Sequence, residues 1–122
     1  MNQSNKCNRQ YDLEERTADF GENIIRFTKK LNLKPIYNSL IIQLIKSSTS
    51  IGANYMEANG ASSKKDFRNK IAICKKESKE SKHWLRMITA VDDNYRGDVK
   101  VLWKEAQEFT LIFGKILSSS SK

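Results

Sequence analysis

Residues 64–88 read KKDFRNKIAICKKESKESKHWLRMI, and this stretch decides the fold class. Apolar or small residues recur in it at steps of three and four, the spacing of one face of an α-helix. That face consists of Phe67, Ile71, Cys74, Ser78, Ser81, Leu85 and Ile88. Ser63 followed by Asp66 has the spacing of a capping box at a helix start. The pattern predicts an amphipathic helix over about 64–89.

Three further segments carry the same periodicity, at about 13–32, 37–59 and 98–117. Asp12 and Asp98 are placed to cap the first and last of them. The last is expected to turn one apolar face inward, made of Val99, Leu102, Trp103, Ala106, Phe109, Phe113 and Ile116. Four helices of about 20 residues joined by short loops predict an all-α fold, an antiparallel up-down-up-down four-helix bundle.

The bundle is expected to form one domain over 12–117 of the 122 residues, between a polar tail at 1–11 and a disordered tail at 118–122. Glycine (5) and proline (1) are too scarce for the turns of an all-β chain. No apolar stretch approaches the roughly 20 residues that span a bilayer. The start lacks the hydrophobic core of a signal peptide, so we expect a cytoplasmic protein without membrane contact.

The net charge of +8 is concentrated on one helix. Residues 62–88 carry nine bases and three acids, a net charge of +6. Six of the bases share one side of the helix: Lys64, Arg68, Lys75, Lys79, Lys82 and Arg86. Asp66, Ile73, Glu77, Glu80 and Trp84 occupy the opposite flank. This basic stripe is a candidate for contact with a phosphate backbone, while an ordinary solvated helix face remains the alternative.

The basic stripe predicts recognition of charge or shape rather than of base sequence. Only Trp84 is close enough for base stacking, and it lies on the acidic flank.

A second nonpolar stripe outside the core face predicts a self-association surface, because one apolar face per helix fills the core of a bundle. Its members are Ile42, Ile45, Thr49, Gly52 and Met56 on the second helix, with Ile73 and Trp84 on the third. Gly52 and Ala53 would let another helix approach closely. Scattered apolar surface residues are the alternative explanation.

No residue pattern predicts catalysis, a metal site or a cofactor. His83 is the single histidine, and neither a second histidine nor a cysteine pair is available to complete a zinc site. Cys7 lies in the polar tail and Cys74 on a core face, which argues against a disulfide and makes Cys74 a small apolar filler. We therefore expect a protein that is not an enzyme.

Two motifs carry a resemblance to a known family. Residues 47–58 read SSTSIGANYMEA, and residues 66–85 read DFRNKIAICKKESKESKHWL. They resemble the four-helix-bundle proteins named after the intervening sequence of bacterial 23S ribosomal RNA genes, over about residues 11–117. The matching positions are Ser50, Ile51, Asn54 and Glu57, then Asp66, Phe67, Ala72, Glu77, Glu80, Trp84 and Leu85.

The resemblance implies a bacterial four-helix bundle that assembles into a homo-oligomeric ring, commonly a pentamer. It also implies kinship with the basic accessory proteins of diversity-generating retroelements, which work with a reverse transcriptase and nucleic acid. Two functions stay open: an oligomer that binds RNA through the basic stripe, and an oligomeric scaffold for an acidic protein partner, for example a reverse transcriptase, without direct RNA binding. For Asn54 and Glu57 we expect hydrogen bonds between helix ends or subunits.

Overall fold

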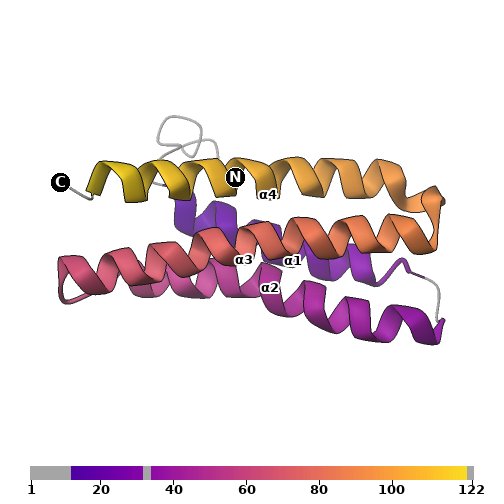
Figure 1. Ribbon diagram of the computed structural model, residues 1–122. Helices are drawn as coiled ribbons and strands as arrows, with labels where there is room; N and C mark the ends of the chain where they lie inside the picture. The colour runs from indigo at the N-terminus through magenta and orange to yellow at the C-terminus, as the bar shows by residue number, and fades with distance from the viewer. Residues whose placement is uncertain (1–11, 32–33, 121–122) are drawn as a thin grey trace.

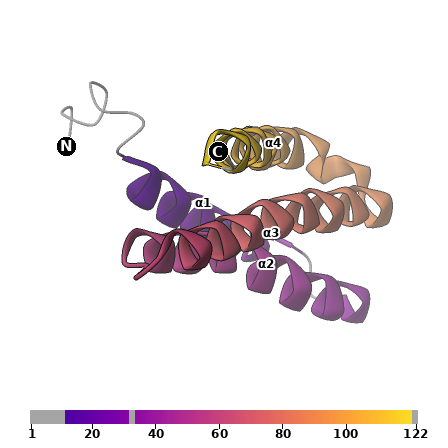
Figure 2. The ribbon, with the colours of Figure 1, turned by 60° about the vertical axis from the view of Figure 1, so that its left-hand side comes forward.

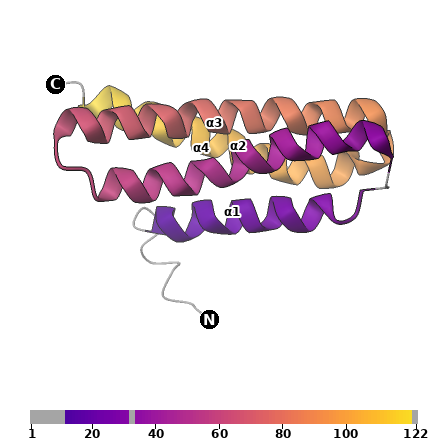
Figure 3. The same ribbon diagram turned by 90° about the horizontal axis from the view of Figure 1, so that it is seen from below.

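The computed structural model describes residues 12–31 and 34–120. In this part of the chain it contains no strand and four α-helices: α1 (Leu13–Thr28), α2 (Pro35–Asn59), α3 (Lys64–Val91) and α4 (Arg96–Ser120), with a short 3₁₀-helix η3 (Asp93–Tyr95) before α4. Consecutive helices run in opposite directions (Figure 1, Figure 3). The predicted all-α four-helix bundle is confirmed.

The helix bounds differ from the prediction mainly at the two outer helices. α1 ends at Thr28 rather than near residue 32. α4 continues to Ser120, so residues 118–120, which were expected in a disordered tail, belong to the helix. Arg68 of α3 accounts for this extension, because its Nη1 donates to the Leu117 carbonyl and to Ser120 Oγ, each at 2.7 Å. The expected tails at 1–11 and 121–122 lie outside the described residues.

The helix starts agree with the predicted caps in one case of three. Ser63 Oγ accepts a hydrogen bond from the Asp66 amide at 3.0 Å, which confirms the cap of α3. Asp12 makes no such bond, and Asp98 falls inside the first turn of α4 rather than before it. Pro35 is the first residue of α2, a position where its missing N–H costs no hydrogen bond.

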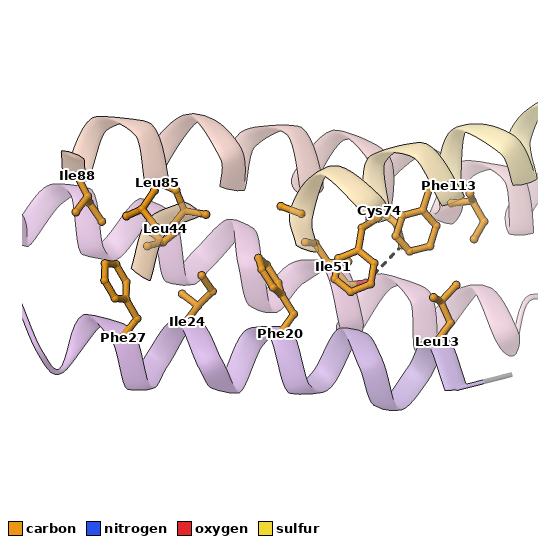
Figure 4. Packing of buried hydrophobic residues seen from close by; sticks show 14 of the residues in the cluster. Leu13, Phe20, Ile24, Phe27, Leu44, Ile51, Cys74, Leu85, Ile88 and Phe113 are labelled. Carbon is orange, nitrogen blue, oxygen red and sulfur yellow. Dashed lines mark hydrogen bonds between the residues drawn. The ribbon is translucent and has the colours of Figure 1, made fainter. Parts of the chain in front are cut away.

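The core runs the length of the bundle and receives side chains from all four helices (Figure 4). Phe20, Ile24, Leu44, Leu85 and Phe113 are among its fully buried members. Phe20 and Phe109 meet edge to face, with their ring centroids 5.5 Å apart. This arrangement is one of the two that aromatic pairs prefer, and it ties α1 to α4 inside the core.

Small polar residues line the contact between α2 and α3. Ser47 Oγ and Ser81 Oγ are buried and lie 3.0 Å apart, and Ser81 Oγ also donates to the Glu77 carbonyl. Serine side chains are small, and these buried hydroxyls have hydrogen-bond partners. The two helices can therefore pack closely along this seam.

α3 lies between α2 and α4 and packs along both, whereas α1 packs chiefly on α2 and makes few contacts with α4 (Figure 2). Arg16 bridges that looser seam: its Nε and Nη2 donate to the two carboxylate oxygens of Glu105 at 2.8 Å, and Nη2 also reaches Glu108 at 3.0 Å. One flank of α3 therefore faces α2 and the other faces α4.

No helix in the described part of the chain is both long and apolar enough to cross a bilayer.

Candidate nucleic-acid interface

The basic stripe of α3 lies on the flank that faces α4. Arg68 reaches the end of α4 through Leu117 and Ser120. Lys82 Nζ donates to Gln107 Oε1 in the middle of α4. Between them, the Lys75 ammonium passes 3.5 Å from where a Cβ on Gly114 would stand. The stripe therefore runs along the side of α3 that contacts α4.

The six predicted contact residues fall into two groups. Arg68, Lys75 and Lys82 are half-buried against α4 and have structural contacts there. Lys64, Lys79 and Arg86 are exposed. Within residues 12–31 and 34–120, neither Lys79 nor Arg86 is in an ion pair. Lys79 and Arg86 have exposed side chains that a ligand can reach, and the first group adds its charge to the same groove between α3 and α4.

α4 meets the basic stripe with neutral and basic residues, since its Arg96 and Lys100 border the same cavity as Arg86. Trp103, Gln107 and Gly114 face α3, while Glu105 and Glu108 lie on the side of α4 that faces α1 and pair with Arg16. These two carboxylates of α4 are thus engaged at the opposite seam. Among the described residues, no α4 carboxylate is therefore paired across the groove with a cation of the stripe, and the carboxylate that borders Lys75 and Lys79 is Glu80 of α3 itself.

The other flank of α3 is balanced in charge. Lys70 Nζ pairs with Glu57 Oε1 of α2 at 2.9 Å. Glu77 lies one heptad further on and is half-buried, and this burial raises the pKa of its carboxyl group. Glu57 therefore bridges two helices, as expected, whereas the Asn54 amide bonds within α2 to the carbonyl and hydroxyl of Ser50, each at 2.9 Å.

Trp103 is the residue that the sequence-based interpretation missed. It was expected to face inward, but its side chain is 38% exposed. Lys82 Nζ lies over its ring, 5.0 Å from the centroid. The ring also borders a cavity of about 330 Å³ between α3 and the start of α4, lined by Arg86, Thr89, Arg96, Val99, Lys100 and Trp103. An aromatic surface therefore does stand beside the cations, and it comes from α4.

The histidine and the other tryptophan lie away from this groove. Trp84 follows Lys70 and Glu77 in heptad register and so sits on the α2-facing flank of α3, as predicted. His83 is exposed and rests edge-on against Trp84, with the ring centroids 4.8 Å apart. No cluster of three or more metal-ligating side chains occurs among the described residues.

The predicted self-association residues divide between the two sides of α2. Ile42, Thr49 and Met56 are exposed, and Ile45 is half-buried. At Gly52 the helix α1 of the same chain packs closely on α2, because a Cβ at this position would lie only 3.3 Å from Thr17 Oγ1. Thr49, Gly52 and Met56 border a groove of about 410 Å³ with α1.

The two members on α3 are half-buried. Ile73 and Trp84 lie on the side of α2 away from that groove, and Trp84 Nε1 is buried with no acceptor among the described residues. The seven positions therefore do not form one continuous surface, because those on α2 face α1 or solvent and the two on α3 are half-buried.

Cys74 behaves as the apolar filler that was predicted. Its side chain is fully buried, and its Sγ donates to the Ile51 carbonyl at 3.5 Å (Figure 4). Burial raises the pKa of the thiol to about 12, so the nucleophilic thiolate is suppressed at neutral pH.

Both the sequence and the fold are similar to those of known proteins. A family model described as 23S rRNA-intervening sequence protein matches residues 9–115. The chain belongs to this family. A structure similar to it is the 1.70 Å crystal structure of a protein of unknown function from the S23 ribosomal protein family of Bacteroides thetaiotaomicron. The two chains are 28% identical with a TM-score of 0.79, and the match covers 86% of this chain and 97% of the other.

A search of curated proteins gives no match. Family membership and the similar structure support the fold and the assignment of the two motifs in α2 and α3.

Proposed function

We propose that this protein is a non-enzymatic, self-associating four-helix bundle that binds nucleic acid, RNA in particular, along the groove between α3 and α4. One observation carries the proposal: in the described residues no carboxylate of α4 is paired with a cation of the stripe, because Glu105 and Glu108 pair with Arg16 and Asp98 pairs with Lys30. If the cations of the stripe served only to keep the protein soluble, carboxylates of α4 could pair with them across the contact between the helices.

The length of the groove suits an extended polyanion. From Lys75 to Arg86 the stripe advances about 16 Å along α3, at 1.5 Å per residue. Lys79 and Arg86 present their charges at the groove surface. Release of counterions from phosphates provides the driving force for such binding, so affinity is expected to fall steeply with salt.

The test is charge reversal at two positions of the stripe that hold no side chain of α4 in a hydrogen bond. In Lys75→Glu/Lys79→Glu, affinity for RNA should fall, and the slope of log affinity against log salt should flatten by about 0.7 for each phosphate of a single strand that the variant no longer neutralises. Lys82 is left unchanged because it is bonded to Gln107. Fluorescence anisotropy with a labelled RNA at several salt concentrations measures both quantities.

The matched control moves the same charge away from the groove. Lys29 follows α1 and Lys34 precedes α2, and both are exposed. Lys29→Glu/Lys34→Glu has the same net charge as the test variant and should retain most of the affinity. Equal losses in the two variants would show that only net charge matters. A wild-type protein with no salt-dependent affinity for RNA would overturn the proposal and leave an acidic protein as the partner to seek.

A further inference from the structure

We propose that the cavity between α3 and the start of α4 binds an unpaired nucleobase, stacked on Trp103, with the adjoining phosphates of a single strand on Arg86 and Lys100. The inference rests on the proposed nucleic-acid binding and adds to it the class of ligand: single-stranded rather than duplex nucleic acid.

The aromatic surface is the first part of the argument. Trp103 is 38% exposed although it lies beside the core residues Val99 and Ala106, and its side chain borders the cavity, so part of the indole is accessible to a ligand. The Lys82 ammonium lies over the ring, and Gln107 holds that ammonium by accepting its hydrogen bond. Trp103 lies on a helix rather than on a loop, and its ring is in contact with Lys82. Its side chain therefore loses little entropy when a base stacks on it.

The charges around the ring are the second part. Arg86, Arg96 and Lys100 all border the same cavity as Trp103. Arg96 is paired with Asp93, but Arg86 and Lys100 are in no ion pair within residues 12–31 and 34–120. One aromatic face flanked by two such cations combines the two elements that single-strand binding sites share, a stacking platform and a charge for the backbone.

The same geometry disfavours a duplex as the ligand of this cavity. In a duplex the bases stack on one another, so only phosphates would reach the groove and Trp103 would contribute nothing. A volume of about 330 Å³ lies at the lower end of small-ligand cavities, which suits one nucleobase rather than a helix edge. Lys79 and Lys75 border a further pocket beside Leu117, near the end of α4, so they extend the basic path for the bound strand in that direction.

The experiment compares Trp103→Leu with Trp103→Phe on three probes: a single-stranded RNA, the corresponding duplex, and an abasic phosphodiester of the same length. Leucine keeps the apolar bulk without a π-face, and phenylalanine keeps the π-face. Trp103→Leu should weaken single-stranded RNA binding by roughly 5- to 150-fold, the range for loss of one stacked base. Trp103→Phe should restore most of it, and binding of the duplex and abasic probes should be unchanged in both variants.

A spectroscopic readout reports on the stacking itself. In a Trp84→Phe background, Trp103 is the sole tryptophan. Its fluorescence should be quenched by the single-stranded RNA and much less by the abasic probe at equal saturation. A single-stranded DNA of the same sequence should quench comparably, because stacking does not involve the 2′-hydroxyl.

The outcomes separate this inference from the proposed function. Equal losses of single-stranded and duplex affinity in Trp103→Leu, or unchanged single-stranded affinity beside a wild-type protein that binds RNA, would overturn the stacking site and leave groove binding intact. Absence of RNA binding in the wild type would instead remove the proposed function on which the inference rests.

Discussion

Arg16 of α1 pairs with two carboxylates of α4. Its guanidinium meets Glu105 and Glu108 and lies 5.2 Å from the centre of the Phe109 ring. The hydrogen bonds to Glu105 raise the pKa of the guanidinium against the opposing effect of burial. Both carboxylates therefore pair on the side of α4 that faces α1, and neither is paired with a cation of the basic stripe.

Trp103 and Gly52 show what periodicity misses at the scale of the residue. Each sits at the margin of an apolar face, where 100° per residue does not decide between core and surface. Trp103 is drawn toward the lysine of α3, and Gly52 is used for the close approach of α1. The sequence did indicate a close approach at Gly52, but it could not show that the approaching helix is α1 of the same chain, and it gave no signal for the lysine beside Trp103, because each partner comes from another helix.

The buried thiol of Cys74 predicts a pH effect on stability. The folded-state pKa of about 12 exceeds the ordinary value of 9.0, so between these pH values the unfolded chain loses the proton and the folded chain keeps it. The contribution is fully present below pH 9 and is lost as pH rises toward 12. The free energy of unfolding should fall with pH in this window by up to about 1.4 kcal/mol per unit from this group.

Urea unfolding between pH 9 and pH 11 measures that slope in a Cys7→Ser background and in the same background with Cys74→Ala. The variant shares every other titrating group, so its stability should fall less steeply with pH, even though the loss of Sγ lowers its stability overall. Parallel slopes in the two proteins would contradict the prediction.

At the scale of the element, α3 is the helix whose structure agrees most closely with the sequence prediction. It begins at the predicted cap, its predicted core face is buried, apart from a half-buried Phe67, and its charges divide between two flanks as the spacing indicates. The outer helices deviate, since α1 stops at Thr28 and α4 continues to Ser120. The end of α4 depends on Arg68, a residue of another helix, so local propensity alone does not predict it.

Two helical glycines provide a matched test of how closely the elements pack. A Cβ at Gly114 would meet only the flexible end of Lys75, at 3.5 Å. Gly114→Ala should therefore raise the free energy of unfolding by about 0.5–1 kcal/mol through helix propensity. A Cβ at Gly52 would lie 3.3 Å from Thr17 Oγ1, a hydroxyl held by its 2.8 Å hydrogen bond to the Leu13 carbonyl.

Gly52→Ala is accordingly expected to gain less than Gly114→Ala or to lose stability, because Thr17 has little room to yield. Urea denaturation of both variants against the wild type decides the order. A larger gain at Gly52 than at Gly114 would show that the contact between α1 and α2 is looser than the structure has it.

At the scale of the whole molecule, the exposed apolar residues predict self-association. Ile42 is 63% exposed and Met56 is 60% exposed, and their spacing places them on the same side of α2, where Met56 lines the groove shared with α1. Ile25 of α1 lines that groove and is 41% exposed. Apolar side chains gathered at one face are typical of a surface covered by a partner, and a second copy of the chain is the partner predicted here.

Ile42→Glu/Met56→Glu should therefore shift the protein to monomer at micromolar concentration, as measured by light scattering or sedimentation. Leu111→Glu is the control, since Leu111 is 62% exposed on α4. A wild-type protein that is monomeric under these conditions, or an assembly abolished in Leu111→Glu and kept in the double variant, would contradict this surface.

The sequence by itself determined the class of fold, the four helices, their core faces and the segregation of charge along α3. These follow from spacings within single helices, where hydrophobic period and charge register are local properties. The two motifs in α2 and α3 were also enough to indicate the family that the family model identifies.

Only the tertiary structure decided what the basic stripe faces. Lys82 and Gln107 are 25 residues apart in the chain, and Arg68 and Ser120 are 52 apart. Which side of α4 turns toward α3 depends on how two helices rotate to bury their apolar faces together, and on Arg16 drawing Glu105 and Glu108 to the opposite seam. That rotation places Trp103 beside the cations and turns a charged helix face into a candidate binding groove.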